Sequence, residues 1–254
     1  MRYGLQLFSV RDSAKENYEA TLAKVAEMGY KMVEPAGFFD HSAKEVVDIV
    51  NKYGLEICST HTPSHVLFEN FEETLEFHKA IGCHDIVIPW GSYETKVEMD
   101  AFIDKVNYYL PILKKEGITL HYHNHSAEFL PNKDGEKVWF ELFERTEIMF
   151  QVDTFWVYNA RLDPVEFIEK YRDRISLVHL KDGVPVPSLD DISTLHTGAI
   201  RRALGEGHAP VEAVRKKAIE LGFKMVVESE GLDPCGLDEV KRCIDYLHTL
   251  DAND

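Results

Sequence analysis

The sequence lacks paired cysteines, long apolar runs and a signal-peptide pattern. Its four cysteines, Cys58, Cys83, Cys235 and Cys243, show no CxxC spacing, and their usage fits a reducing compartment. No apolar run approaches the roughly 20 residues that are needed to span a bilayer. The N-terminus enters an apolar strand without the hydrophobic region of a secretory signal. We therefore expect a soluble, cytoplasmic protein.

Basic clusters are also missing. The chain has 28 basic and 44 acidic residues, giving a net charge of −16, and the basic residues are scattered among the acids. This charge would repel nucleic acids and anionic membrane surfaces, so we expect neither as a partner. A length of 254 residues, with 44% hydrophobic and 28% charged residues, is typical of one globular α/β domain of barrel size.

A unit of apolar strand, polar loop and amphipathic helix recurs along the whole chain. Expected strands cover 3–8, 31–35, 55–60, 85–89, a stretch starting at 117, 147–152, 175–180 and 223–227. Helical spacing predicts helices near 18–29, 42–53, 71–81, 97–116, 137–145, 164–171, 211–221 and 237–247. Glycines such as Gly29 and Gly222 stand where these helices should end.

Eight alternating units predict a single (β/α)₈ TIM barrel over residues 1–254, without an internal domain boundary. An open doubly wound sheet is the structural alternative, but the first turn lacks the GxGxxG pattern. Residues 181–209 form the longest irregular segment, rich in Pro, Gly, Asp and His. That segment is too long for a plain connector and is interpreted as an active-site loop.

The expected strand ends are rich in ionisable residues. Residues 120–129 read LHYHNHSAEF, and an extended backbone places His121, His123 and His125 on one face, with Glu128 just beyond. Later strands end at Asp153, His179 and Glu228. In a barrel, the carboxyl ends of the strands form the active site.

Four of these residues, Glu128, Asp153, His179 and Glu228, form a sensible ligand set for one divalent metal ion. Carboxylates with one imidazole suit Mn²⁺, Mg²⁺, Co²⁺ or Zn²⁺, and three carboxylates would repel one another without a cation. Each residue alone has a structural alternative as a turn cap, an ion-pair partner or a core histidine. The prediction therefore depends on the four residues together.

Five segments resemble the xylose-isomerase-like superfamily of sugar phosphate isomerases and epimerases. They are GLQLFSVRD (4–12), YHNHSAEF (122–129), VDTFW (152–156), VHLKD (178–182) and VVES (226–229), in family order along the chain. The resemblance implies a metal held by Glu128, Asp153, His179 and Glu228, with Glu128 and Glu228 as the acid/base pair. It is specific for the superfamily but does not identify a substrate.

The same resemblance implies a set of substrate-binding residues, which are His61, Trp90, His123, His125, Trp156 and Lys181. Residues 193–202, with His196, Arg201 and Arg202, match no family pattern. Their arginines could hold a phosphate, although a salt-bridged surface segment is the favoured interpretation. Family barrels often associate, so homo-oligomerisation stays open.

The predicted function is a metal-dependent sugar or keto-sugar isomerase or epimerase of carbohydrate metabolism. A metal would polarise the carbonyl and stabilise an enediolate, while one glutamate removes the neighbouring proton and the other returns one. The same residues permit loss of a β-hydroxyl, so a dehydratase or lyase acting on an inosose-like or 3-keto sugar is the alternative. A phosphodiester-cleaving barrel is disfavoured by the charge of −16, and a non-catalytic sugar-binding barrel by the intact ligand set.

Overall fold

Nine strand segments form one parallel sheet in the computed structural model, which describes residues 1–91 and 93–253. The order around the sheet is β3-β2-β1-β11-β8-β7-β6-β5-β4. The segments are β1 (Tyr3–Gln6), β2 (Met32–Glu34), β3 (Glu56–Ile57), β4 (Thr60–His61), β5 (Asp85–Ile88), β6 (Thr119–His123), β7 (Met149–Asp153), β8 (Ile175–Leu180) and β11 (Lys224–Val227).

The two ends of this sheet are consecutive parts of the chain, and that closes the barrel. β3 pairs with β2, whereas β4, only two residues further on, pairs with β5. Between them the Cys58 amide donates to the Val33 carbonyl of β2 at 3.0 Å, and the His61 amide of β4 donates to the Pro35 carbonyl directly after β2 at 2.8 Å. β3 and β4 are thus one strand position, and the predicted (β/α)₈ barrel is confirmed.

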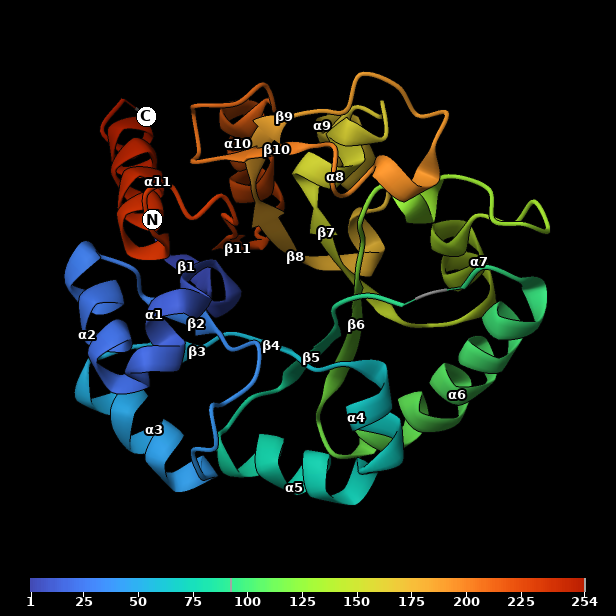
Figure 1. The fold of residues 1–254 in the computed structure, drawn as a ribbon. Coiled ribbons are helices and arrows are strands. Elements are labelled where there is room, and N and C mark those ends of the chain that lie inside the picture. Colours follow the sequence, from blue (N-terminus) through green and yellow to red (C-terminus); the bar gives the residue numbers. More distant parts are fainter. Residues whose placement is uncertain (92, 254) are drawn as a thin grey trace.

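Helices surround the barrel and cover its outer face (Figure 1). They are α1 (Arg11–Glu16), α2 (Tyr18–Met28), α3 (Ala43–Lys52), α4 (Ser64–Glu69), α5 (Phe71–Ala80), α6 (Lys96–Lys115), α7 (Val138–Arg145), α8 (Thr154–Asn159), α9 (Pro164–Lys170), α10 (Val211–Leu221) and α11 (Gly236–Asp251). Capping boxes start two of them, with Ser42 and Glu45 at α3, and Thr95 and Glu98 at α6. None of the helices in the described residues is long and apolar enough to cross a membrane.

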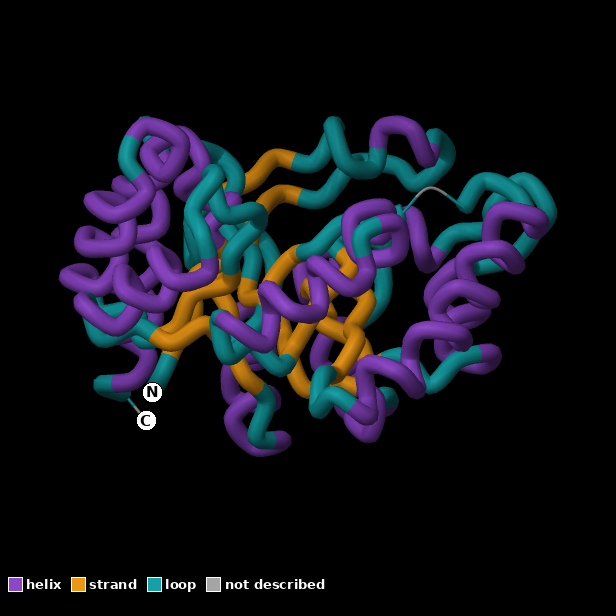
Figure 2. Tube along the Cα trace, turned by 90° about the horizontal axis from the view of Figure 1, so that it is seen from below, coloured by secondary structure: helices purple, strands orange, loops and turns teal. Residues whose placement is uncertain are grey.

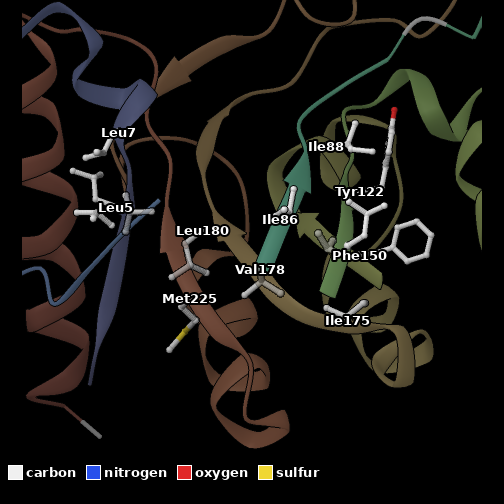
Figure 3. Close-up of a cluster of buried hydrophobic side chains, with 14 of the residues drawn as sticks. Leu5, Leu7, Ile86, Ile88, Tyr122, Phe150, Ile175, Val178, Leu180 and Met225 are labelled. Atoms are coloured by element: carbon white, nitrogen blue, oxygen red, sulfur yellow. The ribbon is translucent and has the colours of Figure 1, made fainter. Parts of the chain in front are cut away.

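The strands alternate between the helical layer and the barrel interior. Leu5, Tyr122, Phe150 and Val178 belong to the large apolar cluster that also contains the buried faces of the helices (Figure 3). Because successive side chains of a strand point to opposite faces, the residues next to them, such as His179, point into the barrel. This alternation places polar groups in a line along the inside of otherwise apolar strands.

Small and apolar side chains form one layer inside the barrel. Met32, Cys58 and Val226 form a separate buried cluster there. A side chain at Gly4 would meet Val226 Cγ2 at 3.2 Å and Cys58 Sγ at 3.4 Å, so the absence of a Cβ lets these strands approach closely. This apolar layer lies between the polar groups of the cavity and a second polar group at the strand starts, where Lys224 pairs with Asp85 at 2.8 Å and His121 Nε2 lies 2.9 Å from Ser176 Oγ.

The irregular segment 181–209 contains a two-stranded antiparallel hairpin, β9 (Asp182–Val184) with β10 (Ile200–Arg202), which the sequence had not suggested. The short 3₁₀ turn η4 (Ile192–Thr194) lies between them. Figure 2 shows this excursion standing outside the barrel strands. The buried Asp182 carboxylate accepts hydrogen bonds from the amides of Gly183, Gly205, Gly207 and Ala209, which fixes where the excursion starts and returns.

A buried ion pair joins the last helix to the first strand. Arg215 of α10 is fully buried, donates to Tyr3 Oη at 2.7 Å and pairs with Asp251 of α11. Replacing Arg215 by Met should lower the free energy of unfolding by about 3 kcal/mol, because the buried Tyr3 hydroxyl and the partly exposed Asp251 carboxylate each lose a charged hydrogen-bond donor. Thermal unfolding should show a melting temperature lower by about 6–12 °C.

The matched control is Lys216→Met on the same helix. Lys216 pairs with Glu212 on the exposed face of α10, so this change should alter stability by less than about 1 kcal/mol. Equal losses in the two variants would contradict a structural role for the buried pair.

Candidate active site

The carboxyl ends of the barrel strands open into a cavity of about 800 Å³. Its described lining includes Glu128 and Glu228, the two predicted acid/base residues, together with His61 and His123. These residues come from β4, β6 and the segments that follow β6 and β11. The cavity lies at the end of the barrel where the strand topology places an active site.

Four residues form a compact group of potential metal ligands in this region. One ligand-type atom from each of His123, Asp153, His179 and Glu228 lies within 4.8 Å of the others. Three of them are ligands predicted from the sequence, and the fourth, His123, was predicted to bind substrate. Glu128 is not in this group, so its role as a ligand stays a prediction without this geometric support.

The donor set fits a divalent cation. Asp153 Oδ2 is buried without a hydrogen-bond partner among the described residues, although Lys181 Nζ lies 3.8 Å away. Burial raises the pKa of Asp153 to about 7, even though Lys181 opposes this effect. Burying a carboxylate oxygen without a hydrogen-bond donor is energetically unfavourable, and a bound cation would remove this cost.

Glu34 at the end of β2 orients the imidazole of His179. His179 Nε2 donates to Glu34 Oε1 at 2.7 Å, while its Nδ1 lies 3.2 Å from Glu228 Oε2. Burial opposes ionisation of Glu34, but the charges of His61 and His179 and the hydrogen bonds from His179 and Ser59 outweigh it, lowering the pKa of Glu34 to about 2. An ionised carboxylate behind Nε2 leaves Nδ1 as the atom that faces the ligand group.

Gln151 orients the imidazole of His123 in the same way. Its side-chain Oε1 accepts from His123 Nδ1 at 3.0 Å and from His61 Nε2 at 2.8 Å, while its Nε2 donates to Glu34 at 2.5 Å. The hydrogen-bond network therefore assigns the proton of His123 to Nδ1. Its Nε2 is left unprotonated, as a nitrogen that ligates a metal ion must be. Both imidazoles are held in orientations that suit metal binding.

Lys181 lies behind the carboxylates and is not among the described lining residues of the cavity. Its buried ammonium donates to Glu228 Oε2 at 3.0 Å and to Glu230, and it lies 5.0 Å from the centre of the Trp156 ring. Burial lowers the pKa of Lys181, but Glu228, Glu230 and Asp153 outweigh burial and raise it. The charge of Lys181 thus compensates a cluster of negative groups.

Glu128 occupies an environment separate from the ligand group. It belongs to the 3₁₀ turn η2 (Ala127–Phe129), where its Oε2 accepts from the His125 amide at 2.9 Å and its Oε1 from Tyr122 Oη at 3.2 Å. Burial raises the pKa of Glu128 to about 7. A carboxyl group with a pKa near neutrality, facing the cavity, is suited to accept and return protons.

The other predicted substrate-binding residues line the cavity as well. His61, Trp90, His125 and Trp156 all contribute to its wall, and Trp90 is 59% exposed. They are distributed around the cavity, a position that is compatible with substrate contact. Their role in substrate binding stays a prediction.

The segment 193–202 reaches the cavity instead of forming an isolated surface patch. His196 lines the wall and stacks on Trp156, with ring centres 5.1 Å apart. Arg201 Nη2 lies 2.9 Å from His196 Nδ1, and its Nε lies 3.9 Å from Glu230. The favoured interpretation of this segment as a salt-bridged surface therefore needs correction at His196, which is part of the pocket.

Two residues of the site were not predicted as such from the sequence. Glu34 lies within the expected strand 31–35 without a predicted role, and Gln151 lies within the expected strand 147–152 without one. A usable signal exists for Gln151, because it stands two residues before Asp153 in an apolar strand and so shares its face. No comparable signal exists for Glu34, because the sequence shows only a single carboxylate after Met32 and Val33.

Comparisons with known proteins agree with this architecture. A family model described as a xylose isomerase-like TIM barrel matches residues 22–250. The crystal structure of a sugar phosphate isomerase/epimerase from Parabacteroides distasonis ATCC 8503 is similar, with a TM-score of 0.78, 26% identity, and coverage of 97% of this chain and 93% of that one.

Among curated proteins, inosose dehydratases are similar to the chain. Those of Mesomycoplasma hyopneumoniae (strain 7448) and Geobacillus kaustophilus (strain HTA426) are each 25% identical, over 188 and 191 residues. Each match covers 65% of this chain, and it covers 62% and 61% of the two relatives. The matched region thus spans about three-fifths of those relatives' length.

Proposed function

Because the chain belongs to the xylose isomerase-like TIM barrel family, we propose that it is a divalent-metal-dependent isomerase or epimerase of a keto-sugar. The observation that carries the proposal is one cavity lined by two differently placed carboxyl groups. Glu228 belongs to the group of four ligands, and Glu128 stands apart with a raised pKa. This arrangement supports the removal of a proton next to a carbonyl group.

Four residues would hold the cation: His123 through Nε2, His179 through Nδ1, and the carboxylates of Asp153 and Glu228. When bound, it would act as a Lewis acid on the substrate carbonyl. Glu128, the carboxyl group outside the ligand set, would remove the α-proton. Isomerisation would follow if Glu128 returned that proton to the neighbouring carbon while the hydroxyl proton moved between the two oxygens. Epimerisation would require Glu228 to enter the reaction protonated and to give its proton to the opposite face.

A dehydratase is the second candidate, favoured by the two inosose dehydratases that are 25% identical to the chain. Removal of the same α-proton followed by departure of a β-hydroxyl gives an unsaturated ketone. Glu128 would serve as the base in both reactions. The difference lies in whether a group in the cavity protonates the leaving hydroxyl. Burial and Lys181 lower the pKa of His125, which also lines the cavity, to about 3, so this imidazole is unsuited to that step.

The test is solvent exchange in D₂O with a panel of keto-sugars and inososes, followed by NMR. An isomerase or epimerase should incorporate deuterium next to the carbonyl without forming an unsaturated product, whereas a dehydratase should form the enone. Treatment with a chelator should abolish either reaction, and added Mn²⁺ should restore it. A protein that exchanges no proton in any substrate of the panel, even when supplied with metal, would rule out both candidates.

Glu34→Gln should weaken metal binding about 10–100-fold, the usual effect of removing a carboxylate behind a ligating histidine. An amide at this position accepts more weakly from His179 and turns an NH₂ group toward the donors of Gln6, Ser59 or Gln151. Competition with a fluorescent chelator would measure the affinity. The matched control is Glu56→Gln on the exposed end of β3, and comparable losses in the two variants would contradict the orienting role of Glu34.

A cytoplasmic location, the absence of a nucleic acid partner and the oligomeric state stay predictions. They do not enter the proposed chemistry.

A further inference from the structure

The cavity is divided into two chemically different halves by the order of the strands. Loops after β6, β7 and β11 supply the ionisable groups described above. Loops after β1, β2, β4 and β5, which are adjacent in the barrel, supply the opposite wall (Figure 1). From these early loops the described lining residues are Phe8, Ala36, Gly37, Phe38, Thr62, Pro63, Val66, Pro89, Trp90 and Gly91, and none of them is charged.

Large apolar side chains are exposed at the cavity, two of them on this second wall. Eight large hydrophobic side chains are exposed in the described part of the chain, and three of them line the cavity: Phe8 (41%), Trp90 (59%) and Ile192 (46%). They come from three segments far apart in the sequence, after β1, after β5 and in η4. Exposed apolar groups gathered at one cavity indicate a surface that a ligand covers.

The volume is larger than the reaction alone requires. A cavity of about 800 Å³ lies near the upper end of the ~300–1,000 Å³ range of pockets for drug-sized ligands. A single sugar ring is smaller than a drug-sized ligand, so one ring placed against the ligand group would leave part of this volume unfilled.

The lining of that half is poorly suited to a phosphate or carboxylate, since Arg11 is stacked on the Phe8 ring, 4.1 Å from its centre, and donates to the Phe8 carbonyl. Among the described lining residues there are three glutamates, Glu128, Glu228 and Glu230, but neither lysine nor arginine. Lys181 and Arg201 are engaged by Glu228, Glu230 and His196 behind the wall. An anionic group needs donors or cations in the wall, whereas an uncharged ring with an apolar face needs only aromatic and aliphatic contacts.

We infer that the substrate is an uncharged glycoside, in which the keto-sugar is joined through a glycosidic bond to a second ring. This inference rests on the proposed function, which places the keto-sugar in the ionisable half. The second ring, aromatic or another sugar, lies against Trp90 and Phe8. The residues that determine specificity are then those of the early loops.

Binding of unreactive probes tests this inference without requiring turnover. Calorimetry in excess Mn²⁺ would compare glucose, glucose 6-phosphate, the two anomers of 4-nitrophenyl glucoside, and the disaccharides cellobiose and maltose. At least one glycoside should bind about tenfold or more tightly than glucose, and glucose 6-phosphate should gain nothing. The aryl glucosides and the disaccharides separate the two sources of the second ring.

Trp90→Ala and Phe8→Ala should each reduce the preference for the glycoside over glucose by about 3–10-fold, the range expected for one aromatic contact. The matched control is Tyr108→Ala, an aromatic residue that is 66% exposed on α6 and outside the cavity. The inference is overturned if no glycoside binds more tightly than glucose, if glucose 6-phosphate binds most tightly, or if both cavity variants keep the full preference.

Failure of this inference is distinguishable from failure of the proposed function. Proton exchange in free keto-sugars without a preference for glycosides would overturn the inference and leave the proposed function intact. Tight glycoside binding without proton exchange in any keto-sugar or keto-glycoside would uphold the inference about the ligand and overturn the proposed reaction.

Discussion

A Glu128→Gln variant is expected to lose proton exchange by about 10²–10⁴-fold, the usual contribution of a positioned general base. The amide keeps the size of the side chain and can still accept from the His125 amide and meet Tyr122 Oη, the two partners of the carboxylate. It cannot accept the substrate proton. Because Glu128 is outside the group of four ligands, metal content should be unchanged.

The same variant should be more stable than the wild type at alkaline pH. Burial raises the pKa of Glu128 from 4.5 to about 7, so the unfolded chain ionises this group more readily than the folded protein does. The folded state therefore loses stability as the pH rises from 4.5 to 7. At about 1.4 kcal/mol per pH unit, the interval corresponds to about 3 kcal/mol. Gln removes this penalty, and the gain should vanish near pH 4.

Urea denaturation of the metal-free proteins at pH 4.5 and pH 8 would measure this difference, with Glu144→Gln on the exposed face of α7 as the matched control. The pH profile of exchange is a second measure. The wild-type rate should rise with pH through about 7 and then level off, because only the carboxylate accepts a proton. Full exchange activity in the Glu128→Gln variant, or a stability difference that does not depend on pH, would contradict this assignment.

The barrel could be predicted because strands and helices leave different periods in the sequence. Strands such as β7 alternate outward apolar residues, Phe150 and Val152, with inward polar ones, Gln151 and Asp153, and helices such as α3 begin at a recognisable capping box. The hairpin β9–β10 could not be predicted in this way. Its strands have three residues each, too few to show a period, and the carboxylate that fixes it, Asp182, meets partners more than 20 residues away.

Only part of the ligand set could be predicted from the sequence, and the reason is geometric. Three imidazoles and one carboxylate fall within residues 121–128, and which of them faces the ligand group depends on where β6 stops. The strand ends at His123, so His123 projects into the barrel beside His179, with ring centres 4.8 Å apart. Glu128 follows a change of direction and enters a turn. No local pattern in the sequence fixes that end point.

Asp153→Asn and His123→Ala should each remove the bound metal almost completely and reduce proton exchange to background. Both residues belong to the group of four ligands, and Asp153 contributes a buried oxygen without a hydrogen-bond partner among the described residues. A tightly bound divalent ion contributes about 10–16 kcal/mol shared among four ligands, so each ligand accounts for about 10²–10³-fold in affinity. Metal analysis of the purified proteins should find about one ion per chain in the wild type only.

The two variants, read beside Glu128→Gln, also decide between the ligand set predicted from sequence and the set grouped by the structure. If the structural group holds the ion, His123→Ala loses metal and Glu128→Gln keeps it, and only the latter protein still gains thermal stability when Mn²⁺ is added, because binding to the folded state alone shifts unfolding. The reverse result would return Glu128 to the ligand set and leave His123 as a substrate contact. Loss of metal in both would mean that Glu128 moves onto the ion when it binds, and the base would then have to be Glu228 or a group outside the carboxylates.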